Sequence, residues 1–144
     1  MAYYADLEPC DYFGPFRRPY LTAVGWLERR REYRRGGDLS PEFWNKLLLL
    51  LADPWTSLGV CGGMHDCDLC RLSAGVRGIN YLIVPGDETL YISPDYIHHY
   101  IDAHDYCPPE AYCRAVMRCP PPRSMEFLRA VNKAGGKELL RAND

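Results

Sequence analysis

The chain has 144 residues, of which 47% are hydrophobic and 25% are charged, and its formal net charge is −2. This length and composition predict one globular domain, and the small negative charge argues against binding driven by global charge, such as coating DNA or an anionic membrane. No apolar run is long enough to cross a membrane and the N-terminus shows no secretory signal, so we expect a cytoplasmic protein with no membrane partner.

The first third of the chain is expected to contribute an aromatic arm, a strand and a basic turn. Residues 1–20 are rich in Tyr, Phe and Pro, which predicts an extended arm that packs aromatic rings onto the body. Leu21 to Leu27 has the β-branched and aromatic composition of a strand. Five arginines then fall between Arg29 and Arg35, and the glycine pair that follows indicates a turn or hairpin tip.

A helix is predicted to begin at Pro41. Ser40 is a favoured N-cap, and proline is favoured at the first helical position because its missing N–H would have no partner there. Asp53 precedes a proline and is therefore expected to end the helix. The five consecutive leucines from Leu47 to Leu51 cover every face of the last turn, so we expect this helix to be buried on most sides.

A β-hairpin is predicted in the second half of the chain. Ile79 to Val84 and Thr89 to Ile92 have strand composition, and the four residues between them have turn composition. Three helices should follow, beginning at Ser93-Pro94, at Pro108-Pro109-Glu110 and after Ser124.

These elements predict an α+β fold, in which a small antiparallel sheet with a zinc knuckle, β-hairpin and helix unit is packed by several helices. We expect one zinc-binding domain over residues 1–136 and a frayed tail over residues 137–144.

The segment between Cys61 and Cys70 contains three of the seven cysteines and one of the four histidines. Cys67 and Cys70 have C-x-x-C spacing, which is typical of a knuckle in which two thiolates converge on Zn²⁺. Clustered cysteines in a chain without a signal peptide favour metal binding over disulfides. The alternative is a set of unliganded buried thiols, and a redox C-x-x-C is disfavoured because this one precedes a hairpin.

The remaining ligands are expected on the helix after the hairpin. His99 is the first candidate there, and His104 competes with His65 for the last position. Five residues of regular helix rotate by about 500°, so two imidazoles at that spacing converge only if the helix loosens before Asp105. Cys61 is a weaker candidate, and His98 is expected to point elsewhere because it lies one residue round the helix.

The other four cysteines are scattered, and we interpret them as buried small side chains or free thiols: Cys10, Cys107, Cys113 and Cys119.

A structural zinc is favoured over a catalytic one. A catalytic site leaves one position open to water beside a carboxylate, and four aspartates lie near the candidate ligands in sequence: Asp66, Asp68, Asp102 and Asp105. However, the chain contains no H-E-x-x-H and no zinc-deaminase pattern.

The arginine run is the one marked charge feature of the sequence. Arg30, Arg31, Arg34 and Arg35 could form a basic patch for phosphate or an acidic partner, whereas the alternative is a solvated turn. If the run is a strand, alternate arginines point to opposite faces and the patch is halved.

The chain resembles a family of small bacterial proteins of uncharacterised function. The matching elements cover roughly residues 3–117 and are Val24-Gly-Trp-Leu27, Pro41-Glu-Phe43, His65-x-Cys67-x-Leu-Cys70, Val84-Pro-Gly86, His99-Tyr100, His104, Tyr106 and Pro108-Pro109. The resemblance favours His65, Cys67, Cys70, His99 and His104 as metal ligands over Cys61 and His98. It implies no particular activity.

Three functional hypotheses follow, of which the first is favoured. The protein is a non-enzymatic, zinc-stabilised interaction protein with a protein partner, of an adaptor, regulatory or immunity type. The second hypothesis is a nucleic-acid-binding module that uses the Arg29–Arg35 run. The third is a zinc-dependent hydrolase.

Overall fold

The computed structural model describes residues 3–11, 21–55, 65–70, 77–78 and 81–137, and of residues 65–66 and 77–78 it describes the backbone only. Residues 12–20 of the expected arm, Cys61, the start of the predicted strand at Ile79 and residues 138–144 of the expected tail lie outside these ranges. Within them, no helix is long and apolar enough to cross a membrane.

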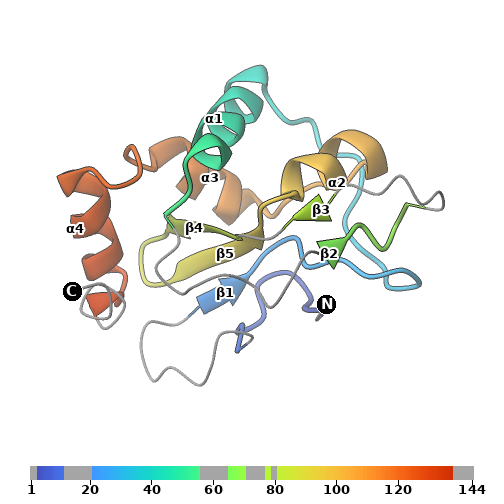
Figure 1. Ribbon diagram of the computed structural model, residues 1–144, viewed down its shortest axis with the longest axis horizontal. Helices are drawn as coiled ribbons and strands as arrows, with labels where there is room; N and C mark the ends of the chain where they lie inside the picture. The colour runs from blue at the N-terminus through green and yellow to red at the C-terminus, as the bar shows by residue number, and fades with distance from the viewer. Residues whose placement is uncertain (1–2, 12–20, 56–64, 71–76, 79–80, 138–144) are drawn as a thin grey trace.

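The centre of the fold is a three-stranded sheet in the order β1-β5-β4, formed by Leu21–Ala23, Leu90–Pro94 and Tyr81–Pro85 (Figure 1). Strands β4 and β5 form the predicted hairpin, with Ile83 opposite Ile92. Strand β1 joins this hairpin parallel to β5, so the sheet is mixed rather than wholly antiparallel. The α+β class is confirmed.

Strand β1 is shorter than the predicted span of Leu21 to Leu27. Gly25 has a φ of +79°, a left-handed conformation that ends the extended backbone. Its N–H donates to Asp6 Oδ1 at 2.9 Å, and a Cβ at this position would lie 2.8 Å from Ile97 Cδ1. The turn after β1 therefore depends on glycine for both its backbone angle and its space.

The N-terminal segment packs along β1, as the expected arm would. The N–H of Cys10 donates to Leu21 O, and the N–H of Leu7 donates to Ala23 O. The ring of Tyr4 meets Trp26 edge to face, with 6.0 Å between ring centroids.

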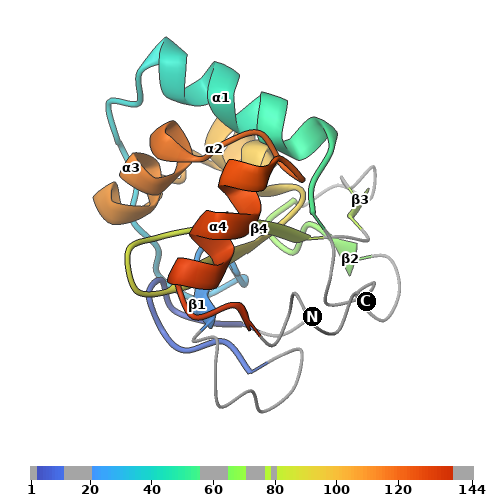
Figure 2. The same cartoon turned by 90° about the vertical axis from the view of Figure 1, so that its left-hand side faces the viewer.

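Four helices follow in the described chain: α1 (Pro41–Ala52), α2 (Ile97–His104), α3 (Glu110–Arg118) and α4 (Met125–Lys133). Helix α3 packs against β4, and α1 packs over α3 (Figures 1 and 2). Helix α4 also contacts β4 and stands at the end of the molecule away from the short ribbon β2 (His65–Asp66) and β3 (Arg77–Gly78) (Figure 1).

Two helix starts were predicted correctly from their caps, and a third was wrong. The hydroxyls of Ser40 and Ser124 each accept an N–H three residues later, at the starts of α1 and α4. Ser93 is instead part of β5, where its hydroxyl is hydrogen-bonded to Tyr112 OH of α3 at 3.1 Å. Because this side chain is used between β5 and α3, it caps no helix, and α2 begins only at Ile97.

The prediction that α1 is buried on most sides is wrong. Phe43, Leu47 and Leu50 are buried, at the i, i+4, i+7 spacing of a single face. Leu49 is 68% exposed and Leu48 is 39% exposed. Since the helix covers α3 from outside, only one stripe of it meets protein.

We predict that Gly25→Ala destabilises the fold by roughly 2–4 kcal/mol. Two effects contribute: the added methyl group clashes with Ile97, and alanine is strained in the left-handed conformation at this position. Gly36→Ala is the matched control, since Gly36 has a φ of +75° but open space around the added Cβ. Urea denaturation should give about 1 kcal/mol for the control. Equal losses for both variants would contradict the close packing at Gly25.

Candidate metal centre

Four side chains that could bind a metal through sulfur or nitrogen converge at the end of the molecule opposite α4. The ligand atoms of Cys67, Cys70, His99 and His104 all lie within 4.8 Å of one another. The two cysteines follow β2 in a tight turn, and the two histidines belong to α2. The Cys₂His₂ set thus joins two segments that are separated by the whole β4–β5 hairpin.

The contacts within the cluster centre on the Cys70 thiol. Cys70 Sγ lies 3.2 Å from His99 Nε2 and 3.4 Å from His104 Nε2, and Cys67 Sγ lies 3.5 Å from His104 Nε2. The two imidazole rings stand nearly perpendicular, at 83°, with centroids 5.0 Å apart. Both rings therefore present Nε2 to the thiols.

The knuckle geometry expected from C-x-x-C is present. Cys67 is buried, and burial raises the pKa of its thiol to about 11. The backbone amides of Leu69 and Cys70 act in the opposite direction, because they are hydrogen-bonded to the Cys67 sulfur and favour its thiolate.

The end of α2 explains how histidines five residues apart can meet. Asp105 adopts a left-handed conformation (φ 54°), and its N–H donates to Tyr100 O. The N–H of Tyr106 bonds the same carbonyl at 3.1 Å. These bonds span five and six residues instead of the four of an α-helix, so the last turn is wide. This is the loosening of α2 that two imidazoles five residues apart need in order to converge.

The surroundings of both histidines favour the neutral imidazole, which is the form that binds a metal. Burial lowers the pKa of His99, and the neighbouring His104 lowers it further. Burial also lowers the pKa of His104, with a second contribution from Arg35. A neutral imidazole has a lone pair on one ring nitrogen, so a lowered pKa favours metal binding at neutral pH.

The competing candidates are placed as follows. His98 lies on α2 outside the cluster, as expected. The backbone of His65 pairs with Gly78 in the β2–β3 ribbon, and its side chain is outside the described structure. Cys61 also lies outside the described ranges. His104 completes a set of four without either of them.

The other cysteines are separate from the cluster. Cys10, Cys107 and Cys119 are buried and Cys113 is half-buried, and none of the four belongs to the Cys/His cluster. This placement agrees with their interpretation as small buried side chains.

One important residue near the cluster was not singled out from the sequence. The N–H of Arg29 donates to Asp68 Oδ2 at 2.6 Å, and its guanidinium donates to the carbonyl oxygens of Asp68 and Cys70 at 3.2 and 3.4 Å. These contacts join residues about forty positions apart, so no local pattern could indicate them. Arg34 is separated from the other arginines of the Arg29–Arg35 run, because it lines a hollow between α1 and α3.

We predict that Cys70→Ala and His104→Ala lose stoichiometric metal binding, because each removes one of four convergent donors. Titration with Co²⁺, followed by its visible absorption, would detect both thiolate ligation and tetrahedral geometry. His98→Ala is the matched control on the same helix and should keep the wild-type spectrum. His65→Ala should also keep it, and loss of binding in that variant would assign the fourth position to His65 instead.

Comparison with known proteins adds a family but no activity. No curated protein and no solved structure shows significant similarity to the chain. The model of a family described as a domain of unknown function, DUF7919, matches residues 2–117. The matched region includes all four residues of the cluster and everything from β1 to nearly the end of α3, and α4 follows it. Because the match covers most of the chain, the protein belongs to the DUF7919 family.

Proposed function

We propose that the Cys67–Cys70–His99–His104 cluster holds a structural Zn²⁺ ion, and that the protein is a non-enzymatic, zinc-stabilised interaction protein. The observation on which this depends is the convergence of two thiols and two imidazoles within 4.8 Å. Zinc is the divalent ion for which mixed thiolate and imidazole ligands in a tetrahedron are most typical.

The distances between donors support a tetrahedral ion. With the usual Zn–S and Zn–N bond lengths, a tetrahedral angle places a sulfur and a nitrogen about 3.6 Å apart. Three of the four sulfur–nitrogen separations in the cluster range from 3.2 to 3.5 Å, and all four ligand atoms lie within 4.8 Å of one another. Small movements of the side chains would therefore bring the donors to tetrahedral distances.

The same set favours a structural role. Four protein ligands fill a tetrahedron, whereas catalytic zinc keeps one position for water or substrate. The carboxylate of Asp68, one of the acids expected near the site, accepts the backbone N–H of Arg29. It is therefore engaged in fixing a loop instead of facing a metal-bound water.

Zinc would compensate for a thin local core. The knuckle follows a strand of only two residues. Among the described side chains of residues 65–70, Cys67 is the one that is fully buried in the hydrophobic core. In small or loop-rich regions the free energy of metal binding becomes folding free energy. We therefore assign the ion the task of holding the knuckle against α2.

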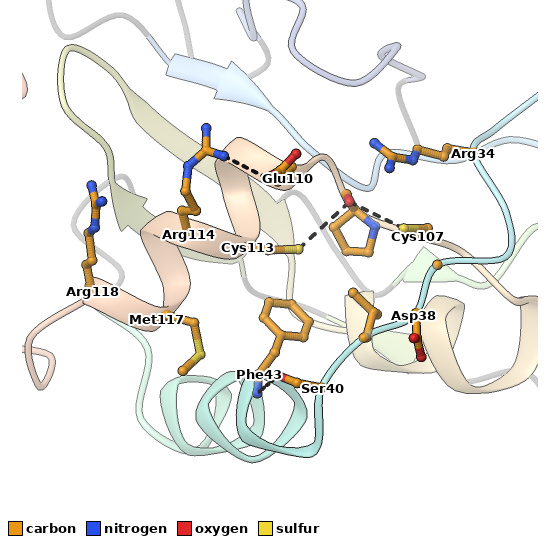
Figure 3. Close-up of a pocket in the computed structure, with 13 residues that line it drawn as sticks. Arg34, Asp38, Ser40, Phe43, Cys107, Glu110, Cys113, Arg114, Met117 and Arg118 are labelled. Carbon is orange, nitrogen blue, oxygen red and sulfur yellow. Dashed lines mark hydrogen bonds and ion pairs between the residues drawn. The ribbon is translucent and has the colours of Figure 1, made fainter.

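The interaction surface that we propose is the groove between α1 and α3, a hollow of about 450 Å³ (Figure 3). Figure 3 shows Phe43 of α1 beside Cys113 and Met117 of α3, with arginines above and beside them. Met117 is 46% exposed, although its side chain is apolar. An apolar side chain of a partner, flanked by acidic residues that complement the arginines, would fit this lining.

We expect chelation to unfold the protein or to lower its melting temperature by about 10 °C or more, because the ion binds the folded state only. The measurement is circular dichroism against temperature, with zinc content determined by elemental analysis. Added Zn²⁺ should restore the transition and Mg²⁺ should not, since Mg²⁺ prefers oxygen ligands. An unchanged transition in metal-free protein would refute a structural ion.

We predict that Met117→Glu weakens binding of the protein partner by about tenfold or more, because it puts a carboxylate in an apolar groove. The partner would be captured from the native host, purified, and titrated against the zinc-loaded protein. Met125→Glu is the matched control, since Met125 is 61% exposed on α4 and does not line the groove. Equal affinities of the two variants would place the interface elsewhere.

A further inference from the structure

The geometry points to a second binding site beside the metal centre, for the phosphate groups of a nucleotide-sized ligand. The site is a hollow of about 720 Å³, which we call the basic hollow. Its lining includes Arg29, Arg30, Arg31, Arg35, Leu69 and His104. The affinity of the arginines for phosphate does not depend on the proposed zinc, but their ordering by the metal centre rests on that proposal.

The loop that forms the basic hollow is attached to both halves of the metal centre. At its start, Arg29 is bonded to the knuckle through Asp68 and Cys70. At its end, the Tyr33 hydroxyl donates to the carbonyl of His104 at 2.9 Å. The backbone of Arg35 pairs with that of Tyr106 in an isolated antiparallel β-bridge. A loop fixed at two points loses less conformational entropy when it binds a ligand. The arginines are thus arranged before any anion arrives.

The charge of the basic hollow is strongly positive. Four arginines line it, and Glu32 is the one carboxylate among the described residues that line it. Arg31 has a partner in Glu28 at 3.9 Å, but both side chains are largely exposed and such a pair is weak. In the described part of the chain, Arg30 and Arg35 form no ion pair with a carboxylate.

Aromatic rings hold two of the guanidinium groups. Arg35 lies 4.5 Å from the ring centroid of Tyr33, and Arg31 lies 4.8 Å from that of Tyr3. Stacking uses the face of a guanidinium and leaves its N–H edge available. Arg30 has a φ of 71°, an uncommon left-handed conformation for a residue other than glycine, Asn or Asp.

These features select the ligand class. The planar guanidinium of arginine can donate two hydrogen bonds to two oxygens of one phosphate group. Several arginines around one hollow therefore favour a ligand that offers several phosphate oxygens. The volume lies in the range of small-molecule sites. The net charge of −2 argues against a long polyanion. A nucleoside diphosphate fits these limits, and so does the 5′-phosphorylated end of an oligonucleotide, where a terminal phosphate is followed by a phosphodiester.

The test is calorimetric titration of the zinc-loaded protein with adenosine diphosphate. We expect binding that weakens as salt is raised, and that falls by about tenfold or more in Arg30→Glu and Arg35→Glu. Arg129→Glu is the matched control, because Arg129 is exposed on α4, outside the basic hollow, and the change in net charge is the same. Equal loss in all three variants, or no binding by the wild type, would overturn the inference.

Two further arms identify the source of the phosphate and separate this inference from the proposed zinc site. A short oligonucleotide with a 5′-phosphate should compete with the diphosphate, and one with a 5′-hydroxyl should not. Equal competition by both oligonucleotides would overturn a site for a terminal phosphate and would indicate an extended nucleic-acid surface instead. Zinc content is measured on the same samples. Normal zinc without phosphate binding refutes the basic hollow alone, whereas phosphate binding by a folded protein without zinc refutes the metal centre alone.

Discussion

The contact between the Cys70 thiol and the two imidazoles of α2 is the interaction on which the far end of the molecule depends. It joins a turn with little core of its own to a helix that is anchored in the core through the buried side chains of Ile97 and Tyr100. The wide last turn of α2 makes this contact possible, because a regular helix would direct His99 and His104 to different sides. A departure from ideal helix geometry is therefore what assembles the site.

The surrounding loops are attached to the same two parts of the molecule, the Cys67–Cys70 knuckle and the end of α2. Arg29 is bonded to the backbone of the knuckle, and Tyr33 is bonded to the backbone of His104. Tyr106, just beyond α2, donates its hydroxyl to both oxygens of Asp6 at 2.8 and 2.9 Å. Burial raises the pKa of Asp6, and these hydrogen bonds act in the opposite direction. A chain of contacts thus runs from the N-terminal segment through the end of α2 to the metal centre.

Local sequence patterns predicted local structure well. The caps at Ser40 and Ser124 depend on bonds within three residues, and the β4–β5 hairpin depends on strands joined by a short turn. The convergence of Cys67 and Cys70, two members of the cluster, was predictable for the same reason. Where tertiary contacts decided the outcome, local pattern was insufficient. Ser93 has the signature of a cap, but its hydroxyl is used against α3.

The candidate site could be narrowed from sequence to five residues but not to four. Whether His104 turns towards His99 depends on the hydrogen bonds after it, which follow from the left-handed backbone at Asp105. No propensity of an aspartate specifies that conformation uniquely. The contribution of Arg29 was invisible because its partners in the knuckle are distant in sequence. The prediction from the five leucines that α1 is buried on most sides was wrong, because composition does not indicate which faces of a helix other elements will cover.

The parallel pairing of β1 with β5 has a consequence for the order of folding. Leu21 pairs with Leu90, so a long stretch of chain must be closed before this ladder gains any hydrogen bond. The hairpin and the unit from Cys67 to His104 close much shorter loops. We therefore expect these to form first, with β1 and the N-terminal segment docking last and setting the slow phase of refolding.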